Sequence, residues 1–279
     1  MPIKKIFFVG LVGFVVVSAV LFWFSFLSEN GTLPSPKARN QPSMVAVSDD
    51  IPITEPSPAI DYSKILEKYR GKDVERAIMD KKLIALTFDG GGNADGIEKI
   101  LKTLSKNSIR LTFFLTGKFV EKFPDEVEEI KKSGGEIANH TYSHKNFIQL
   151  NSEEATGEIN QMKTVAEKMG MALAPFFRFP YGAYKKEGIA LVNGLGYIAV
   201  RWTVDSLGWQ GKRDGREARF VTDRVVEKAA QGGIVLMHLG SAADGSTFDA
   251  DALPGIIATL KEQGYQFVTL SELFTESLR

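Results

Sequence analysis

The sequence predicts an α/β fold in which about seven β/α units form a distorted barrel. Short apolar runs alternate with segments of helical periodicity over residues 82–279, which is typical of a parallel sheet covered by helices. A domain of about 200 residues is large enough for such a barrel. Polar residues also follow the apolar runs, as in barrels whose active sites lie at the C-terminal ends of the strands. We therefore favour a barrel over an open doubly wound sheet.

The individual elements follow from these patterns in chain order. The run LIALTF at residues 83–88 is continuously apolar, as expected of a buried strand. Residues 152–169 combine helical spacing with an S-x-E start, which is typical of a helix N-terminus. Strands are expected at residues 83–88, 110–115, 136–138, 176–179, 198–204, 234–238 and 267–270. Helices are expected at residues 94–105, 123–132, 152–169, 186–194, 217–230 and 253–263.

The chain begins with a segment that is suited to a membrane. Residues 6–27 are apolar and uncharged, and Lys4 and Lys5 precede them. As a helix this segment would rise about 33 Å, enough to cross the bilayer core. We predict a cytoplasmic stub and transmembrane anchor at residues 1–27, with the rest of the chain outside. A cleaved secretory signal, which would release a secreted protein, is the alternative.

A linker and a short lead-in connect this segment to the barrel domain. Residues 28–60 are rich in Pro and Ser and poor in large apolar residues, which is typical of a flexible linker. Ile65, Leu66 and Tyr69 stand at helical spacing and predict a helical lead-in within residues 61–81. The barrel domain then occupies residues 82–279.

Composition excludes several classes of function. The chain has 34 basic and 34 acidic residues, so its formal net charge is zero and a nucleic-acid-binding role is not expected. It has no cysteine, which excludes disulfides, thiolate metal sites and a cysteine nucleophile. A transition-metal site must therefore use histidines and carboxylates. The chain has three histidines, so their positions are informative.

Five residues that could take part in catalysis or metal binding follow predicted strands. The spacing of His140 and His144 lets two imidazoles converge on one ion, although two surface histidines would look the same. Asp89 is a candidate general base, and its ordinary alternative is a helix or turn cap. Arg178 is a candidate salt-bridge partner that would keep Asp89 ionised, or else a surface cation. The fifth residue is His238.

His238 is the candidate general acid. It ends the predicted strand at residues 234–238, and Asp205 ends a neighbouring strand. An Asp205–His238 pair would fix the imidazole and raise its pKa, which suits an acid that protonates a leaving amine. The alternative is a hydrogen-bonded core histidine.

With these residues the chain resembles NodB-like polysaccharide deacetylases, also called carbohydrate esterase family four. The motifs TFD, HTYSH, RFPYG, DSLGW and LMH occur in the family's order between residues 82 and 273. The resemblance implies a NodB homology barrel that holds a divalent cation, Zn²⁺ with Co²⁺ or Mn²⁺ as alternatives, through His140 and His144. It implies that Asp89 is the catalytic base and His238 the catalytic acid.

The resemblance also implies roles for five further residues. Arg178 would position Asp89, and Asp205 would tune His238. The backbone N–H of Tyr181 would stabilise the oxyanion. Trp209 and Leu236 would form the walls of the pocket for the acetyl methyl group.

One position departs from the family pattern. Gly90 stands where the family has a second Asp that ligates the metal. Water, Asp89 or Asp95 could fill the vacant ligand position, and we favour two histidines completed by Asp89 or water. Asp95 has the alternative of a helix-start residue.

These features predict a metal-dependent hydrolase that removes N-acetyl groups from a cell-surface polysaccharide or peptidoglycan. The expected partners are the acetylated glycan and, through the N-terminal helix, a membrane; no nucleic acid and no obligate protein partner are expected. Two alternatives have the same fold. One is a non-catalytic glycan-binding protein, and the other is a hydrolase of another non-peptide amide.

Overall fold

The computed structural model describes residues 60–279, apart from the side chain of Asp214. The predicted anchor at residues 1–27 and the linker up to residue 59 lie outside these residues and stay predictions. Within the described part, no helix has both the length and the apolar character needed to span a bilayer.

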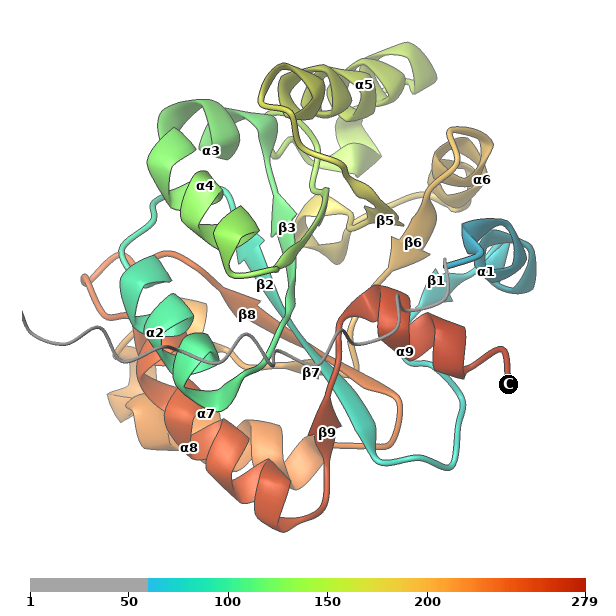
Figure 1. Ribbon diagram of the computed structural model, residues 1–279. Coiled ribbons are helices and arrows are strands. Elements are labelled where there is room, and N and C mark those ends of the chain that lie inside the picture. Colours follow the sequence, from blue (N-terminus) through green and yellow to red (C-terminus); the bar gives the residue numbers. More distant parts are fainter. Residues whose placement is uncertain (1–59) are drawn as a thin grey trace, which may run out of the picture. The chain divides into compact units, whose positions relative to one another are not determined.

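One curled sheet of nine parallel strands forms the centre of the described domain, and helices surround it (Figure 1). The strands follow one another in the sheet in the order β1-β6-β5-β4-β3-β2-β8-β7, and β9 pairs with the start of β2. Their bounds are β1 Asp73–Val74, β2 Leu83–Gly90, β3 Thr112–Leu115, β4 Glu136–Asn139, β5 Ala174–Phe177, β6 Ile198–Val200, β7 Val204–Asp205, β8 Gly233–His238 and β9 Gln266–Phe267. The predicted distorted barrel therefore corresponds to a curled parallel half-barrel.

Most of the helices lie between successive strands, as the alternating pattern predicts, whereas the first helix precedes β1 and the last follows β9. They are α1 Tyr62–Tyr69, α2 Ile97–Asn107, α3 Gly117–Lys122, α4 Pro124–Lys132, α5 Ser152–Lys168, α6 Lys186–Gly194, α7 Ala218–Lys228, α8 Phe248–Glu262 and α9 Leu270–Glu276. Asn151 begins α5 with a reciprocal capping box to Glu154, which satisfies two backbone N–H groups that the first turn leaves free. Figure 1 shows α2, α7 and α8 gathered beside β2 and β8.

Strand β2 determines which side chains reach the site. All of its residues are buried, and successive side chains point to opposite faces of the sheet. Ala85 belongs to the cluster inside the curl with Phe114, whereas Leu86 belongs to the core under the outer helices. Asp89 shares the inner face with Ala85 by this alternation, and Gly90 shares the outer face with Leu86. The side chain at residue 89 therefore points into the curl of the sheet, whereas a side chain at residue 90 would point toward the outer helices.

The single strand predicted at residues 198–204 is wrong, because the structure divides it into β6 and β7. Residues 201–203 leave the ladder and connect two neighbourhoods of the sheet. Arg201 N donates to Val74 O beside β1, whereas Thr203 N donates to Ile234 O of β8. Periodicity alone could not detect this change of neighbour, since both halves remain apolar and extended.

Two helix boundaries also differ from prediction. Helix α8 begins at Phe248 rather than at residue 253, with Pro254 inside it. Proline is usually tolerated in the first turn and disfavoured further in, which explains the late predicted start. Leu270, predicted to end the last strand, instead begins α9 after the capping residue Thr269.

Candidate active site

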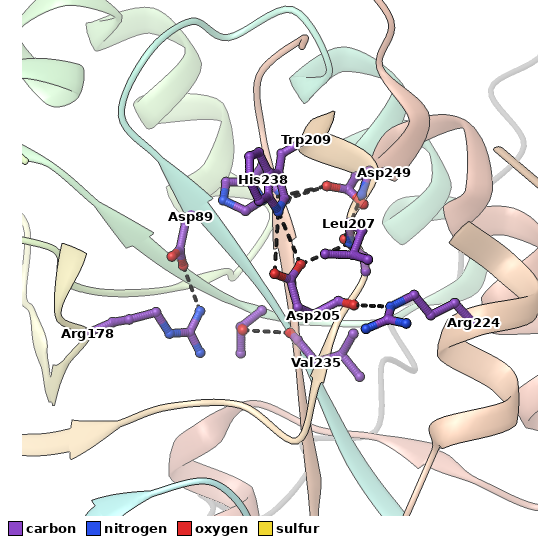
Figure 2. A network of polar contacts seen from close by, with 12 residues as sticks. Asp89, Arg178, Asp205, Leu207, Trp209, Arg224, Val235, His238 and Asp249 are labelled. Atoms are coloured by element: carbon purple, nitrogen blue, oxygen red, sulfur yellow. Dashed lines mark hydrogen bonds and ion pairs between the residues drawn. The ribbon is translucent and has the colours of Figure 1, made fainter. Parts of the chain in front are cut away.

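A buried ion pair lies at the centre of the site. Arg178 follows β5, and its Nη1 donates to Asp89 Oδ1 over 2.6 Å (Figure 2). Arg178 also donates through Nε and Nη2 to the backbone oxygens of Val200 and Arg201. Burial would raise the pKa of Asp89, but Arg178 together with the nearby His140 and His238 outweighs burial and holds that pKa below its usual value. Asp89 is therefore an ionised carboxylate in a fixed orientation, as a general base requires.

His140 faces the same carboxylate from the end of β4. Its Nε2 lies 3.5 Å from Asp89 Oδ2, and its Nδ1 is 2.9 Å from the backbone oxygen of Arg178. The carbonyl can only accept, so Nδ1 carries the proton and Nε2 keeps its lone pair. Burial lowers the pKa of His140 to about 4, so the ring is neutral. A neutral imidazole fixed in this way is typical of a metal ligand.

His144 reaches the site through a tightly held loop. Thr141 and His144 have positive φ angles of 70° and 60°, which are uncommon for residues with a side chain. Asn139 Oδ1 accepts from Thr141 N, and Glu158 accepts from both N and Oγ of Ser143. These bonds hold the loop so that the rings of His140 and His144 lie 4.9 Å apart between centroids. Burial lowers the pKa of His144 as well.

The predicted residues share one cleft of about 570 Å³. Every predicted site residue lines it except Arg178, which lies beneath Asp89. The lining residues are Asp89, Gly91, Gly92, His140, His144, Phe179, Tyr181, Gly182, Trp202, Asp205, Trp209, Leu236 and His238. The sheet thus brings together segments that are far apart in the chain.

The predicted Asp205–His238 pair is wrong as a direct contact. Within the described chain, the carboxylate within ion-pair distance of His238 is Asp249, whose Oδ2 lies 3.7 Å from His238 Nδ1. Asp205 instead accepts from Trp209 Nε1 and from the backbone N–H of Leu207 (Figure 2). Burial would lower the pKa of His238, but the facing Asp249 carboxylate together with Asp89 and Asp205 outweighs burial and raises that pKa.

Aromatic residues surround the mouth of the cleft. Tyr181 has a φ of 60°, and its ring contacts His144 with 4.6 Å between centroids. Its side chain is 70% exposed and Trp209 is 47% exposed, so both present aromatic surface to an incoming ligand. Trp202 was missed from the sequence because residue 202 was expected inside a strand. It packs against Gly182, where an added Cβ would lie 2.8 Å from its ring.

The glycines after Asp89 face different surroundings. A Cβ at Gly90 would lie 2.8 Å from the terminal methyl groups of Leu115 and Leu239, so this position faces the apolar core. A Cβ at Gly91 would make ordinary contacts, 3.7 Å from His144 Cδ2. Asp95 is exposed and accepts from Ser241 Oγ, and it does not line the cleft. Asp95 is therefore not a candidate to complete the ligand set.

Comparison with known proteins identifies the family of this chain. The family model of polysaccharide deacetylases matches residues 76–200. A peptidoglycan-N-acetylglucosamine deacetylase of Bacillus cereus is 34% identical over 200 residues, which are 71% of this chain and 70% of that protein. The chain belongs to the polysaccharide deacetylase family. It is a hydrolase that acts on carbon–nitrogen bonds other than peptide bonds.

Two further relatives extend the comparison. The peptidoglycan-N-acetylmuramic acid deacetylase PdaC of Bacillus subtilis is 34% identical over 194 residues, covering 70% of this chain and 39% of that protein. The structure of BA3943 from Bacillus anthracis, described as a CE4 family pseudoenzyme, matches with a TM-score of 0.68 and 28% identity over 75% of this chain and 70% of that chain. A mutant of BA3943 is described as having restored enzymatic activity. The family fold expected from the motifs is confirmed.

Polysaccharide deacetylases of this family are generally metal-dependent, so the donor set must be tested against a cation. His140 and His144 line one cleft with 4.9 Å between their ring centroids, and the Nε2 of His140 keeps its lone pair for a bond to a metal ion. The neutral imidazoles suit such an ion. However, no group of three or more histidine or acidic side chains among the described residues is arranged to hold a metal. The two histidines therefore fit a divalent cation, but their site lacks a complete protein ligand set.

Proposed function

We propose that this chain is a metal-assisted N-deacetylase of peptidoglycan. The observation that carries the proposal is the meeting of Asp89, His140, His144 and His238 in one cleft, with Asp89 held ionised by Arg178. The activities in the names of the Bacillus relatives support peptidoglycan as the polymer. The name of the Bacillus cereus relative specifies N-acetylglucosamine and that of PdaC specifies N-acetylmuramic acid.

The residues of the cleft can divide the hydrolysis between a base and an acid. Asp89 takes a proton from the attacking water, whose oxygen forms a bond to the amide carbon. His238 gives a proton to the nitrogen as the carbon–nitrogen bond breaks, so that acetate and a free amine leave. In this proposal the backbone N–H of Tyr181 donates to the developing oxyanion. Trp209 and Leu236 enclose the acetyl methyl group.

His140 and His144 would hold the divalent cation. When bound, the ion supplies a positive charge that polarises the amide carbonyl and favours ionisation of water. Zn²⁺ suits two imidazoles best, with Co²⁺ and Mn²⁺ as alternatives. We further propose that residues 6–27 anchor the chain with the deacetylase domain outside the membrane, where peptidoglycan lies.

A non-catalytic glycan-binding function is the second candidate. The resemblance to BA3943 and the incomplete ligand set favour it. In this alternative the cleft binds acetylated sugar through Trp209 and Tyr181 without hydrolysis, because no cation is retained.

One assay separates the two candidates. The full-length chain, loaded in turn with Zn²⁺, Co²⁺ or Mn²⁺, is incubated with peptidoglycan, chitin oligomers and a small cyclic amide, and released acetate or ring-opened product is measured. Acetate release from peptidoglycan that a chelator abolishes supports the proposal. Binding of glycan without release under any metal supports the second candidate. Turnover of the cyclic amide alone supports a different amide hydrolase.

A further inference from the structure

Two facing side chains beside the cleft keep buried polar atoms without a partner. Within the described residues, the buried side-chain polar atoms that lack a hydrogen bond are His238 Nδ1 and Asp249 Oδ1. His238 Nδ1 lies 3.7 Å from the other carboxylate oxygen, Asp249 Oδ2 (Figure 2). Unpaired buried polar groups are costly. The pair is therefore arranged for a state in which a small movement makes a charge-assisted bond, as catalytic hydrogen bonds often tighten when substrate binds.

The backbone fixes the carboxylate relative to the imidazole that it faces. Asp249 lies in the first turn of α8 and is 3% exposed. Its Oδ2 accepts from the backbone N–H of His238 over 2.9 Å. The same carboxylate thus contacts the main chain of His238 and faces its side chain. The N-terminal turn of a helix also favours a negative charge at this place.

Gly208 provides the space that Asp249 occupies. An ideal Cβ at residue 208 would lie 2.3 Å from Asp249 Oδ1 and 2.5 Å from Asp249 Cγ. No side chain at residue 208 can coexist with the carboxylate in its present position. The 3₁₀ turn Gly208–Gln210 and α8 therefore meet at one carboxylate-sized volume beside His238.

Asp205 cannot take the same role without losing its own partners. Its Oδ1 accepts from Leu207 N over 2.9 Å, and both of its carboxylate oxygens lie within 3.4 Å of Trp209 Nε1. These contacts orient Trp209 at the mouth of the cleft. Asp205 is thereby assigned to the wall of the cleft, and Asp249 is left as the carboxylate that faces His238.

We propose that Asp249 is the positioning residue of His238 and that Gly208 is required to make room for it. The inference rests on the proposed function, in which His238 protonates the leaving amine. Asp249 holds the Nδ1–H side of the ring and stabilises the imidazolium. The opposite nitrogen, Nε2, is then oriented to give its proton to the amine. Asp249 itself neither contacts substrate nor exchanges a proton.

The first test compares matched charge-neutralising variants in α8. Asp249→Asn keeps the size of the side chain and an oxygen for His238 N–H, but removes the charge. We expect kcat on peptidoglycan to fall about 10²-fold to 10⁴-fold, with KM within about twofold. Asp251→Asn is the control, since Asp251 lies in the same first turn, pairs with Lys99 and does not line the cleft. A kcat of Asp249→Asn within twofold of that of Asp251→Asn overturns the proposal.

A second readout does not depend on activity. The chain has three histidines, so selective ¹⁵N labelling gives three imidazoles, and His238→Gln identifies the signal of His238. We expect Asp249→Asn to change the ¹⁵N shifts of His238 toward the other tautomer, whereas Asp251→Asn leaves them unchanged. Unchanged His238 shifts in Asp249→Asn overturn the proposal. A changed signal in a chain that releases no acetate supports the Asp249–His238 contact while contradicting the deacetylase function.

A third arm moves the carboxylate to the facing turn. Gly208→Asp alone should lose stability and activity, because two side chains would compete for one volume. Combining Gly208→Asp with Asp249→Ala should restore kcat at least about tenfold over Asp249→Ala alone. A folded double variant without this gain contradicts the claim that residues 208 and 249 share one carboxylate site. If the double variant does not fold, the kinetic and ¹⁵N results decide.

Discussion

Arg178 Nη1 donates a 2.6 Å hydrogen bond to Asp89 Oδ1, and both side chains are buried although they lie at the ends of strands that are not neighbours. Asp89 lies near the end of β2 and Arg178 follows β5, with β3 and β4 between them in the sheet. The curl of the sheet brings the two charges together across its inner face. The guanidinium also lies over the Phe114 ring at 4.0 Å, so packing and charge fix it at once.

Removing Arg178 should destabilise the fold through Asp89. In Arg178→Met the buried carboxylate loses its counter-charge, and breaking such a pair typically costs about 3–5 kcal/mol. The free energy of unfolding in urea measures this loss. Arg201→Met is the control, because Arg201 is partly exposed and 3.6 Å from Asp73, and it should cost less than about 1 kcal/mol. The double variant Arg178→Met with Asp89→Asn should recover part of the loss; no recovery would contradict a pairwise charge effect.

Substitutions of Asp89 and of His140 should have different effects on turnover and on metal content. Asp89→Asn removes the base, so kcat should fall about 10²-fold to 10⁴-fold while a purified sample still contains metal. His140→Ala should lose turnover together with metal content, because one imidazole ligand is gone. Acetate release and elemental analysis measure the two effects, with Asp125→Asn on the exposed first turn of α4 as a control. Full activity and full metal content in His140→Ala would refute the ligand assignment.

A carboxylate that serves as a third metal ligand, beside His140 and His144, should be easier to add at residue 91 than at residue 90. A side chain at Gly91 would start 3.7 Å from His144, whereas one at Gly90 would start among the methyl groups of Leu115 and Leu239. Gly91→Asp is therefore expected to raise Zn²⁺ affinity at least about tenfold, equivalent to about 1.4 kcal/mol. Gly90→Asp should lower the free energy of unfolding, because it buries a charge in the apolar core. Competition with a chromophoric chelator measures the Zn²⁺ affinity. A larger gain in affinity for Gly90→Asp than for Gly91→Asp would contradict the assignment of residue 90 to the outer face of β2.

Glu136 should make stability fall as pH rises. Burial raises the pKa of Glu136, although hydrogen bonds from Ser271 and Thr112 oppose this. Between pH 4.5, the ordinary value, and the raised value, the folded chain holds more protons than the unfolded chain, so its stability decreases with increasing pH. Glu136→Gln should remove this decrease. Urea unfolding across that window measures it against Glu129→Gln, an exposed control; equal slopes for wild type and Glu136→Gln would contradict the prediction.

Much of the site was predictable because its residues lie at strand ends. Asp89, His140 and His238 follow apolar runs that proved to be parallel strands, and parallel strands place their C-terminal ends at one edge. Asp249 was missed for a physical reason. The helix was expected to begin at residue 253, whereas α8 begins at Phe248, so residue 249 fell outside the predicted helix. Trp202 was missed because the break between β6 and β7 carries no local signal.

By itself, the sequence determined the parallel α/β architecture and the set of residues able to bind a cation and move protons, because periodicity and strand-end position are local properties. Tertiary structure alone decided which carboxylate faces His238, which glycine could carry a ligand, and how Arg178 reaches Asp89. These relationships depend on the curl of the sheet and on the volume between a 3₁₀ turn and a helix. Such distances arise only when segments far apart in the chain pack together.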